Sequence, residues 1–303
     1  MVTQPAYDTD FAVTVAQIMR TQLSTYSQTQ DRLFGSVSIE SIPYGKTSIY
    51  RPVADPDQSV TVSRTFQGAP TDQAEKLVQH LDLVNLSDRL SIPRVDFAGD
   101  SANAALHVSA HSSILMDGLE KLFIEGASTT ALAYGVYDFP DGTGGTVNRP
   151  EIAYNDTTDG DWSTTSNIRS DLIKCITGLT LKKFYGPYIM LAPSACRPMF
   201  SEVLANTAVS TSTWIKQNFG LPIAYSPFVH EAATKDDFNI VIIDASKVHM
   251  GMTNIMMDSF YNEDKHAYTY DWEVYAVPLF DPLYDGSEYL KGVARMDLRD
   301  WND

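Results

Sequence analysis

The stretch LEKLFIEGASTTALAYGVYDFPDGTGGTVNRP, residues Leu119 to Pro150, decides how the chain is interpreted. A strongly helical pattern stops at Gly126 and continues as an apolar connector of small residues that contains a second glycine, Gly135. Glycine tolerates positive φ and close backbone approach, so Gly126 is predicted to end the helix as a structural turn. The connector contains no recognisable catalytic residue.

The helix that leads into this stretch is the longest one predicted in the chain. Ser101 is a suitable N-cap for a helix over 103–125. At ~1.5 Å per residue such a helix spans ~35 Å, enough to form the backbone of a flat domain. The preceding run LSIPRVDFAGDSA is predicted to be extended. One apolar stripe follows the helical spacing: Leu115, Leu119, Leu122 and Phe123.

The chain before this helix has two different patterns. The first 35 residues are typical of an arm with one amphipathic stretch. From Gly35 to about Ala74 the pattern alternates in two runs, SVSIESIPYGKTSIYRPV and QSVTVSRTFQGAP, separated by the turn formers of ADPDQ. These runs predict a long hairpin that projects from its domain, because both of its faces are polar. A helical turn is predicted at AEKLVQHLD. The amphipathic stretch of the arm comprises Phe11, Val15, Ile18, Met19 and Leu23.

The second half alternates helix and strand, and the fold class predicted from the whole pattern is α+β. Helices are predicted at 168–181, 198–204 and TSTWIKQNFG, the last closed by Gly220. Strands are predicted at 188–191, LPIAYSPF, FNIVIIDA, MGMTNIMM, 265–279 and EYLKGVARMDL. In the strand 265–279, one apolar face is expected: Tyr268, Tyr270, Trp272, Val274 and Ala276.

The composition is that of an acidic, core-forming chain. Of 303 residues 44% are hydrophobic, and 38 acidic against 22 basic residues give a net charge of −16. Of the acids 28 are Asp and 10 are Glu. This field disfavours non-specific binding to nucleic acid. The Asp excess suggests a salt-rich environment, although an ordinary acidic protein is an equally open interpretation. No apolar run is long enough to span a membrane and no signal peptide is evident, so a soluble, unsecreted protein is expected.

Motifs that would carry chemistry are sparse. His107 and His111 have metal-ligand spacing, but HVSAH is not HExxH and no third ligand is evident, so surface or interface histidines are favoured. Asp236 and Asp237 are expected to be solvated. Cys175 and Cys196 lie outside any CxxC pattern and are predicted to be reduced thiols. No catalytic residue, cofactor or metal site is therefore predicted.

Three local patterns resemble the major capsid proteins of tailed viruses (Caudoviricetes), whose Johnson fold is shared with encapsulin shells. RLSIPRVDFAGDSANAALHV resembles the strand that leads into the long spine helix of that family. LEKLFIEGASTTALAYGVYD resembles the helix end, where a carboxylate precedes two glycines, here Glu125, Gly126 and Gly135. YGPYIMLAPSACRPMFSEVL resembles the strand, turn and helix of the axial domain.

The resemblance implies an architecture of five parts. They are an N-terminal arm (1–35), an extended E-loop hairpin (36–75), a peripheral domain with the spine helix (76–164), an axial domain (165–262) and return strands of the peripheral domain (263–303). An arm and a lone hairpin cannot offset their own ordering entropy, so they are expected to pack on neighbouring subunits.

The resemblance also implies the function. The expected protein is a structural virion component that forms pentamers and hexamers of an icosahedral head, assembled in the host cytoplasm around double-stranded DNA that it does not read by sequence. Portal, decoration and scaffolding proteins are the further partners, and any scaffold is expected to be a separate protein. No membrane partner is expected. Candidate contacts with acidic rims of adjacent subunits are the basic residues of the first 64 positions: Arg20, Arg32, Lys46, Arg51 and Arg64.

Two alternatives stay open. An encapsulin-type nanocompartment shell, which loads cargo protein in place of a genome, would use the same fold. An α+β enzyme with an unrecognised site is the third class. No lysine–asparagine cross-link is predicted, because no pattern around Lys46 or Lys76 singles one out.

Overall fold

The computed structural model describes residues 21, 33–46, 48–52, 78–93, 101–127, 135–136, 162, 165–204, 207–229, 238–262, 264–281, 283–284, 289–290 and 292–298. The helices are α2 (Leu33–Ser36), α4 (Ser101–Glu125), α5 (Thr165–Leu181), the 3-10 turn η1 (Ser194–Cys196), α6 (Arg197–Ser201) and α7 (Thr211–Phe219). The strands are β1 (Ile39–Ser41), β2 (Ser48–Pro52), β3 (Val78–Asp82), β4 (Val84–Pro93), β5 (Tyr188–Pro193), β6 (Ile223–Ser226), β7 (Phe238–Asp244), β8 (Val248–Met252), β9 (Met256–Asn262), β10 (Ala267–Phe280), β11 (Leu283–Tyr284), β12 (Tyr289–Leu290) and β13 (Val293–Leu298).

The first sheet is built around β10, its longest strand. One edge of β10 pairs with β4, and the other pairs first with β9 and then with β8, which in turn pairs in parallel with β1. Burial alternates from Tyr270 to Ala276, because one face packs on helix α4 and the other faces outward. From Ala276 to Phe280 every residue is buried, because core clusters cover both faces of the sheet there. The predicted apolar face of this strand is confirmed for Tyr270, Trp272, Val274 and Ala276.

The second sheet has the order β13-β7-β5-β6, with β6 parallel to β5 and the other pairs antiparallel. Its residues alternate between two cores. Met190, Ile240 and Ile242 pack with α5, α6 and α7 on one face. Leu191 and Ile243 pack with α2 and the end of α4 on the other. The second sheet is therefore the middle layer of three.

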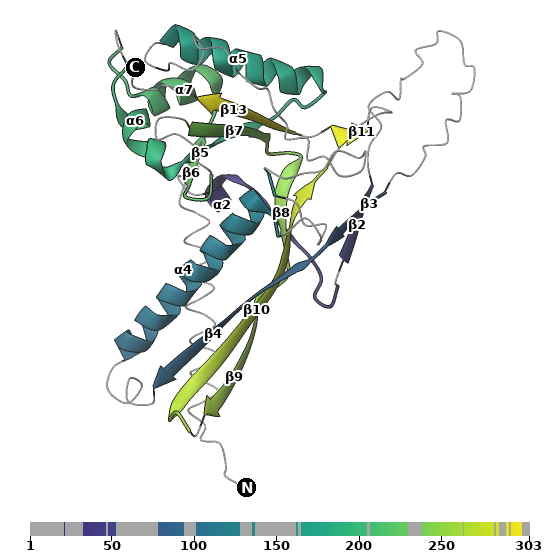
Figure 1. Cartoon of the computed structure of the whole chain (residues 1–303), viewed down its shortest axis with the longest axis vertical. Helices are drawn as coiled ribbons and strands as arrows, with labels where there is room; N and C mark the ends of the chain where they lie inside the picture. The colour runs from purple at the N-terminus through teal and green to yellow at the C-terminus, as the bar shows by residue number, and fades with distance from the viewer. Residues whose placement is uncertain are drawn as a thin grey trace, which may run out of the picture.

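Helix α4 joins the two sheets, as Figure 1 shows by its course from the ribbon of β4, β9 and β10 to the layer of β5 and β6. Val108 and Leu115 pack on the first sheet against Leu90 and Tyr270. The last two turns, including Phe123, pack against residues of the second sheet. The predicted stripe is confirmed, since its four members are at most 4% exposed: Leu115, Leu119, Leu122 and Phe123. A rigid helix of 25 residues thus sets the relative position of both sheets.

The N-terminal β-rich region differs from the prediction. Strand β1 does not belong to a hairpin but pairs with β8 in the first sheet. Strand β2 pairs with β3 over Val78–Asp82, so the prediction of a helical turn at AEKLVQHLD is wrong for those residues. The pairing of Ile49 with Leu81 places Leu81 in a small core with Val277 and Leu279, which favours the strand over the helical alternative. Most of the arm, the hairpin tip and the second run of the predicted hairpin lie outside the described residues, and of the arm only residues 21 and 33–35 are described.

The predicted division of the chain at 262/263 does not separate the strands of the two sheets. Strands β8 and β9, which precede it, lie in the first sheet, and β13, which follows it, lies in the second. The prediction of one strand at MGMTNIMM is replaced by two, β8 and β9, separated by residues 253–255, and EYLKGVARMDL divides into β12 and β13. The division of the chain into five parts stays a prediction.

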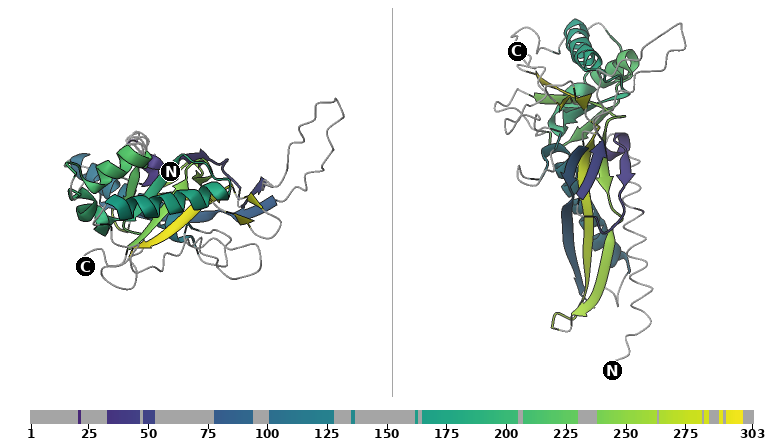
Figure 2. Two further views of the ribbon diagram at one scale, coloured as in Figure 1. Left: turned by 90° about the horizontal axis from the view of Figure 1, so that it is seen from above. Right: turned by 90° about the vertical axis from the view of Figure 1, so that its right-hand side faces the viewer.

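The molecule is elongated along the first sheet. Figure 2 shows the narrow ribbon of β4, β9 and β10 extending away from the three-layered part, with α4 along one face, and Figure 1 shows β2 and β3 directed to the side. Among the described helices none is long and apolar enough to cross a membrane.

Candidate functional site

The end of helix α4 is closed by two glycines that come together in space. Gly126 has a φ of +76°, and its N–H donates to the carbonyl oxygen of Leu122 at 2.9 Å. Gly135 returns so close that a Cβ on it would lie 2.3 Å from the Gly126 nitrogen and from the Ile124 carbonyl oxygen. The Val136 N–H then donates to the carbonyl oxygen of Phe123 at 2.9 Å. The predicted turn residues therefore differ in role: Gly126 supplies backbone conformation and Gly135 supplies space.

The basic candidates for contacts between subunits are described only in part. Lys46 is exposed, one residue after Gly45, which has a φ of +89°. Arg51 lies in β2 opposite Gln79 of β3. Arg20, Arg32 and Arg64 lie outside the described residues. Their contacts with neighbouring subunits stay predictions.

The two histidines of α4 differ in their surroundings. His111 Nδ1 is hydrogen-bonded to Asp88 Oδ2 of strand β4, whereas His107, one turn earlier, is exposed. Among the described residues there is no cluster of three or more His, Cys, Asp or Glu that could hold a metal ion. His111 therefore supplies a hydrogen bond that joins α4 to strand β4 of the first sheet.

The outward face of the first sheet carries a charged pair beside apolar side chains. The Arg89 guanidinium donates to both carboxylate oxygens of Asp271, at 2.5 and 2.8 Å, and lies 5.9 Å from the Phe260 ring centroid. The hydrogen bond to Asp271 raises the pKa of Arg89, and the hydrogen bond with Glu273 raises the pKa of Tyr275. Arg89, Asp271 and Glu273 line an open hollow of about 490 Å³. Its described lining residues are charged, polar or hydrophobic, with two aromatic side chains, and include no serine–histidine or cysteine–histidine pair.

The buried thiols are not suited to nucleophilic chemistry. Burial, followed by the nearby charge of Asp171, raises the pKa of Cys175 to about 12. A thiol with that pKa is protonated at neutral pH and therefore weakly nucleophilic. Asp171 itself is buried and accepts a hydrogen bond from Trp162 Nε1 at 2.9 Å. Neither cysteine is in a disulfide among the described residues, and both are fully buried where half-buried thiols were expected.

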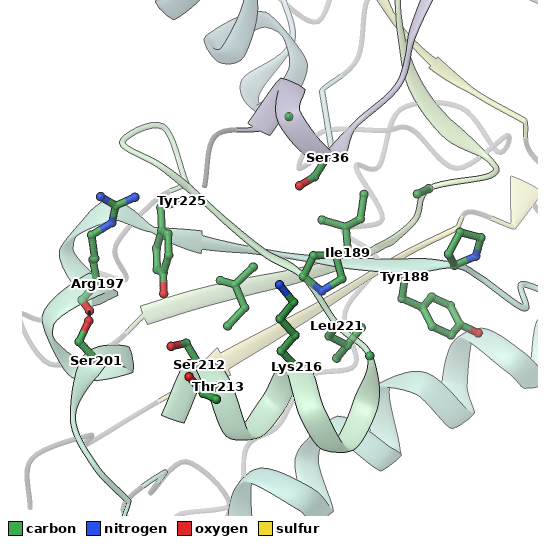
Figure 3. A pocket seen from close by; sticks show the side chains of 16 residues that line it. Ser36, Tyr188, Ile189, Arg197, Ser201, Ser212, Thr213, Lys216, Leu221 and Tyr225 are labelled. Carbon is green, nitrogen blue, oxygen red and sulfur yellow. Dashed lines mark hydrogen bonds between the residues drawn. The ribbon is translucent and has the colours of Figure 1, made fainter. Parts of the chain in front are cut away.

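A larger cleft, of about 750 Å³, lies where the edge strand β6 meets α2 and α7. Figure 3 shows Lys216 projecting from α7 into the cleft, Ser36 entering from α2, and Arg197 beside Tyr225 at one end. The Arg197 guanidinium carbon lies 4.9 Å from the Tyr225 ring centroid, a distance typical of cation–π stacking. We name this feature the α2–α7 cleft.

The α2–α7 cleft was not predicted from the sequence. Its lining comes from residues 35–36, 187–189, 197, 201, 212–213, 216, 220–223, 225 and 245, positions that no single motif links. Lys216 and Arg197 have ordinary helical neighbours in the sequence, so only the packing of α2 and α7 around β6 brings them together.

No family model matches the chain, and no curated protein matches it either. Several solved structures do match the chain. A virus-like particle from Pyrococcus furiosus aligns over 92% of this chain and 98% of its own, with a TM-score of 0.62 and 8% identity. The capsid of an empty GTA particle aligns over 89% and 90%, with a TM-score of 0.59 and 12% identity.

A third similar structure is the capsid of Myoviridae phage XM1. It aligns over 86% of this chain and 90% of its own, with a TM-score of 0.52 and 11% identity. At such low identities the likeness establishes the fold. The chain has the mixed α+β fold of phage capsid proteins, and the resemblance drawn from the three local patterns is confirmed at that level.

Proposed function

We propose that this chain is a major capsid protein, the structural subunit of an icosahedral head that encloses the double-stranded DNA of a tailed virus. The single observation that carries the proposal is the structural match to the capsid of Myoviridae phage XM1, which covers 86% of this chain and 90% of that capsid chain. Self-assembly would proceed through pentamers and hexamers, with the virion as the final location and the host cytoplasm as the place of assembly.

The parts of the fold take matching roles in this proposal. Helix α4 is the spine helix, because it is the long helix that joins the two sheets. The β2–β3 pair is the base of the E-loop, since it leads into the segment 53–77. Strands β5, β6 and β7 with α5, α6 and α7 belong to the axial domain, and β13 pairs with β7 at the edge of their sheet.

Exposed apolar side chains support a subunit that meets neighbours on several sides. Leu106 and Ile114 are 69% and 57% exposed on α4, Leu181 is 78% exposed at the end of α5, and Phe260 is 44% exposed on β9. Large exposed apolar side chains at separate elements favour protein contacts, because their burial on assembly removes apolar surface from water. Enzymatic activity is not part of the proposal.

The charge supports two further details. The net charge of −16 suits an inner wall along which packaged DNA slides, since a basic lining would hold phosphates. The 28 Asp residues favour a halophilic host, where salt screens ion pairs and leaves apolar contacts dominant. Arg20, Arg32, Lys46, Arg51 and Arg64 remain the proposed contacts with acidic neighbours.

The test is purification at high and at low salt, followed by negative-stain microscopy and a nuclease-protection assay on each preparation. Large icosahedral particles with protected DNA are expected, and they should dissociate at low salt if the halophilic detail is correct. A monomer that persists in both salts would contradict the proposal.

The second candidate is an encapsulin-type nanocompartment shell, favoured by the likeness to a virus-like particle over nearly all of that chain. It predicts small closed shells whose content is protein. The same micrographs, with mass spectrometry of the particle content, distinguish the two: a protected genome supports the viral head, and a co-purified cargo protein supports the nanocompartment.

A further inference from the structure

The first sheet has one strand position that the described part of the chain leaves open. Strands β8 and β9 lie one after the other along the same edge of β10, and β1 pairs with the far side of β8. Beside β9, in line with β1, the described residues place no strand. An edge strand of this kind offers its backbone N–H and C=O groups to an added strand, a recurring mode of peptide recognition.

The side chains of β9 do not protect this edge. The strand MMDSFYN contains one charged residue and neither lysine nor proline, the residues that commonly block pairing at edge strands. Met256 and Phe260 are 42% and 44% exposed. Strand β4, at the opposite edge of the ribbon, carries the Arg89–Asp271 ion pair and ends at Pro93. Pairing with a further strand is therefore favoured at β9 over β4.

Asp258, in the middle of β9, favours a cation on the incoming strand. It lies directly opposite Asp271 of β10, and like charges opposite each other destabilise a strand pair. Arg89 hydrogen-bonds both carboxylate oxygens of Asp271 from β4, on the far side. A second cation, opposite Asp258 on the open side, would offset the repulsion in the same way. The exposed face of β9 thus presents an apolar, an anionic and an apolar side chain: Met256, Asp258 and Phe260.

One β-prone run of this chain has the complementary pattern. In QSVTVSRTFQGAP, Val62, Arg64 and Phe66 alternate with polar residues and would share one face of an extended strand. Their order is apolar, cationic, apolar, so Arg64 meets Asp258 whether the two strands run parallel or antiparallel. The strands predicted to pair with this run have other partners, since β1 pairs with β8 and β2 pairs with β3.

The direction of β2 and β3 points to an adjacent copy as the source of the added strand. The run belongs to residues 53–77, which connect the ends of these two strands. Figure 1 shows β2 and β3 directed to the side, away from the end of the ribbon that carries β9. We propose that β9 receives residues 60–66 of an adjacent copy of this chain as an added strand, with Arg64 opposite Asp258. The inference rests on the proposed shell function, because assembly is what brings another copy to this edge.

A charge swap tests the pairing. Asp258→Arg places two cations opposite each other, and Arg64→Asp places two anions there, whereas the double variant restores an opposite-charge pair. The matched control is Asp264→Arg, which changes an exposed acid in the turn after β9 by the same charge as Asp258→Arg. Thermal melting of each unassembled variant establishes that it folds.

Particle yield is measured at the lowest salt concentration at which wild-type particles form, because salt screens exposed charges. Each single reversal should lower the yield by about tenfold, and the double variant should return it to within about threefold of wild type. The control should keep the wild-type yield.

Three outcomes would overturn the inference and leave the shell function standing. They are equal yields for all variants, a double variant that assembles no better than the single ones, and a loss in the control as large as that of Asp258→Arg. A wild-type chain that never assembles would remove the shell function and the inference together.

Disulfide formation identifies the copy that supplies the strand. Chains with Arg64→Cys are assembled with chains that carry Asp258→Cys, and the particles are oxidised, while the native Cys175 and Cys196 stay buried. A reducible dimer is expected on a denaturing gel, and neither variant assembled alone should give it. Chains that carry both substitutions should form linked multimers. Internal links within single chains would contradict the proposal, because the strand would then come from the same copy, and intact mixed particles without any link would contradict it too.

Discussion

At the scale of single residues, the two glycines at the end of α4 show how backbone requirements differ between adjacent positions. Gly126 needs a positive φ, which side chains disfavour, and Gly135 needs the absence of a Cβ, because backbone atoms of Ile124 and Gly126 occupy that space. Gly118, in the middle of the same helix, needs neither, since a Cβ there would meet nothing within 4 Å.

These differences predict opposite effects of the same substitution. Gly135→Ala should lower the free energy of unfolding by roughly 1–3 kcal/mol, because the backbone must move to admit the methyl group. Gly118→Ala is the matched control and should raise it by about 0.5–1 kcal/mol through better helix propensity. Urea denaturation of the unassembled subunit measures both. Equal effects at the two positions would show that the close approach of Gly135 is not maintained in solution.

At the scale of elements, α4 holds the two sheets by burying different turns on each. Its middle packs on the first sheet through Val108 and Leu115, and its end packs on the second through Phe123. The opposite side of the helix keeps Leu106 and Ile114 exposed. A helix packed in this way fixes the two sheets relative to each other, which suits a subunit that must keep one shape within a shell.

Side-chain truncations on the two sides of α4 should therefore lower the free energy of unfolding by different amounts. Phe123 is 0% exposed, so Phe123→Ala should cost about 3–5 kcal/mol through lost transfer energy and the cavity left behind. Leu106, at 69% exposed, should tolerate Leu106→Ala within about 0.5 kcal/mol in the unassembled subunit. Thermal melting of both variants checks this contrast, and similar losses would mean that α4 docks by a different face.

A substitution at the exposed Leu106 also tests assembly independently of folding. If its face of α4 contacts a neighbour, Leu106→Ala lowers the particle yield while the melting temperature of the subunit stays unchanged.

At the scale of the whole molecule, the described cores begin at Leu33. Leu33 and Phe34 of α2 are buried against the end of α4 and the second sheet. The folded layers thus take their first described core residues from the end of the predicted arm. Contacts of residues 1–32 with neighbouring copies stay a prediction.

If the arm contacts other copies as proposed, deletion of residues 1–32 should leave a folded subunit and prevent shell formation, because those contacts between copies are lost. Size-exclusion chromatography with microscopy measures assembly, and circular dichroism measures folding. Intact particles from the shortened chain would show that the arm is dispensable, and an unfolded subunit would show that it belongs to the core.

The sequence by itself determined the elements whose signals are local. The span and apolar stripe of α4, the end at Gly126, the helix of TSTWIKQNFG with Gly220 at a φ of +65°, and the alternating face of β10 all follow from periodicity and capping within one segment. The resemblance to tailed-virus capsid proteins depended on such local patterns too, and this is why it identified the fold correctly.

Only the tertiary structure decided the features that depend on distant partners. AEKLVQHLD has helical spacing, but its last five residues form a strand because β2 supplies backbone partners and Leu81 enters a core with Val277. The parallel pairing of β1 with β8 and the place of β13 in the second sheet arise in the same way. The α2–α7 cleft exists because helices distant in sequence pack around one strand edge, and the sign of its charge depends on which side chains that packing brings together.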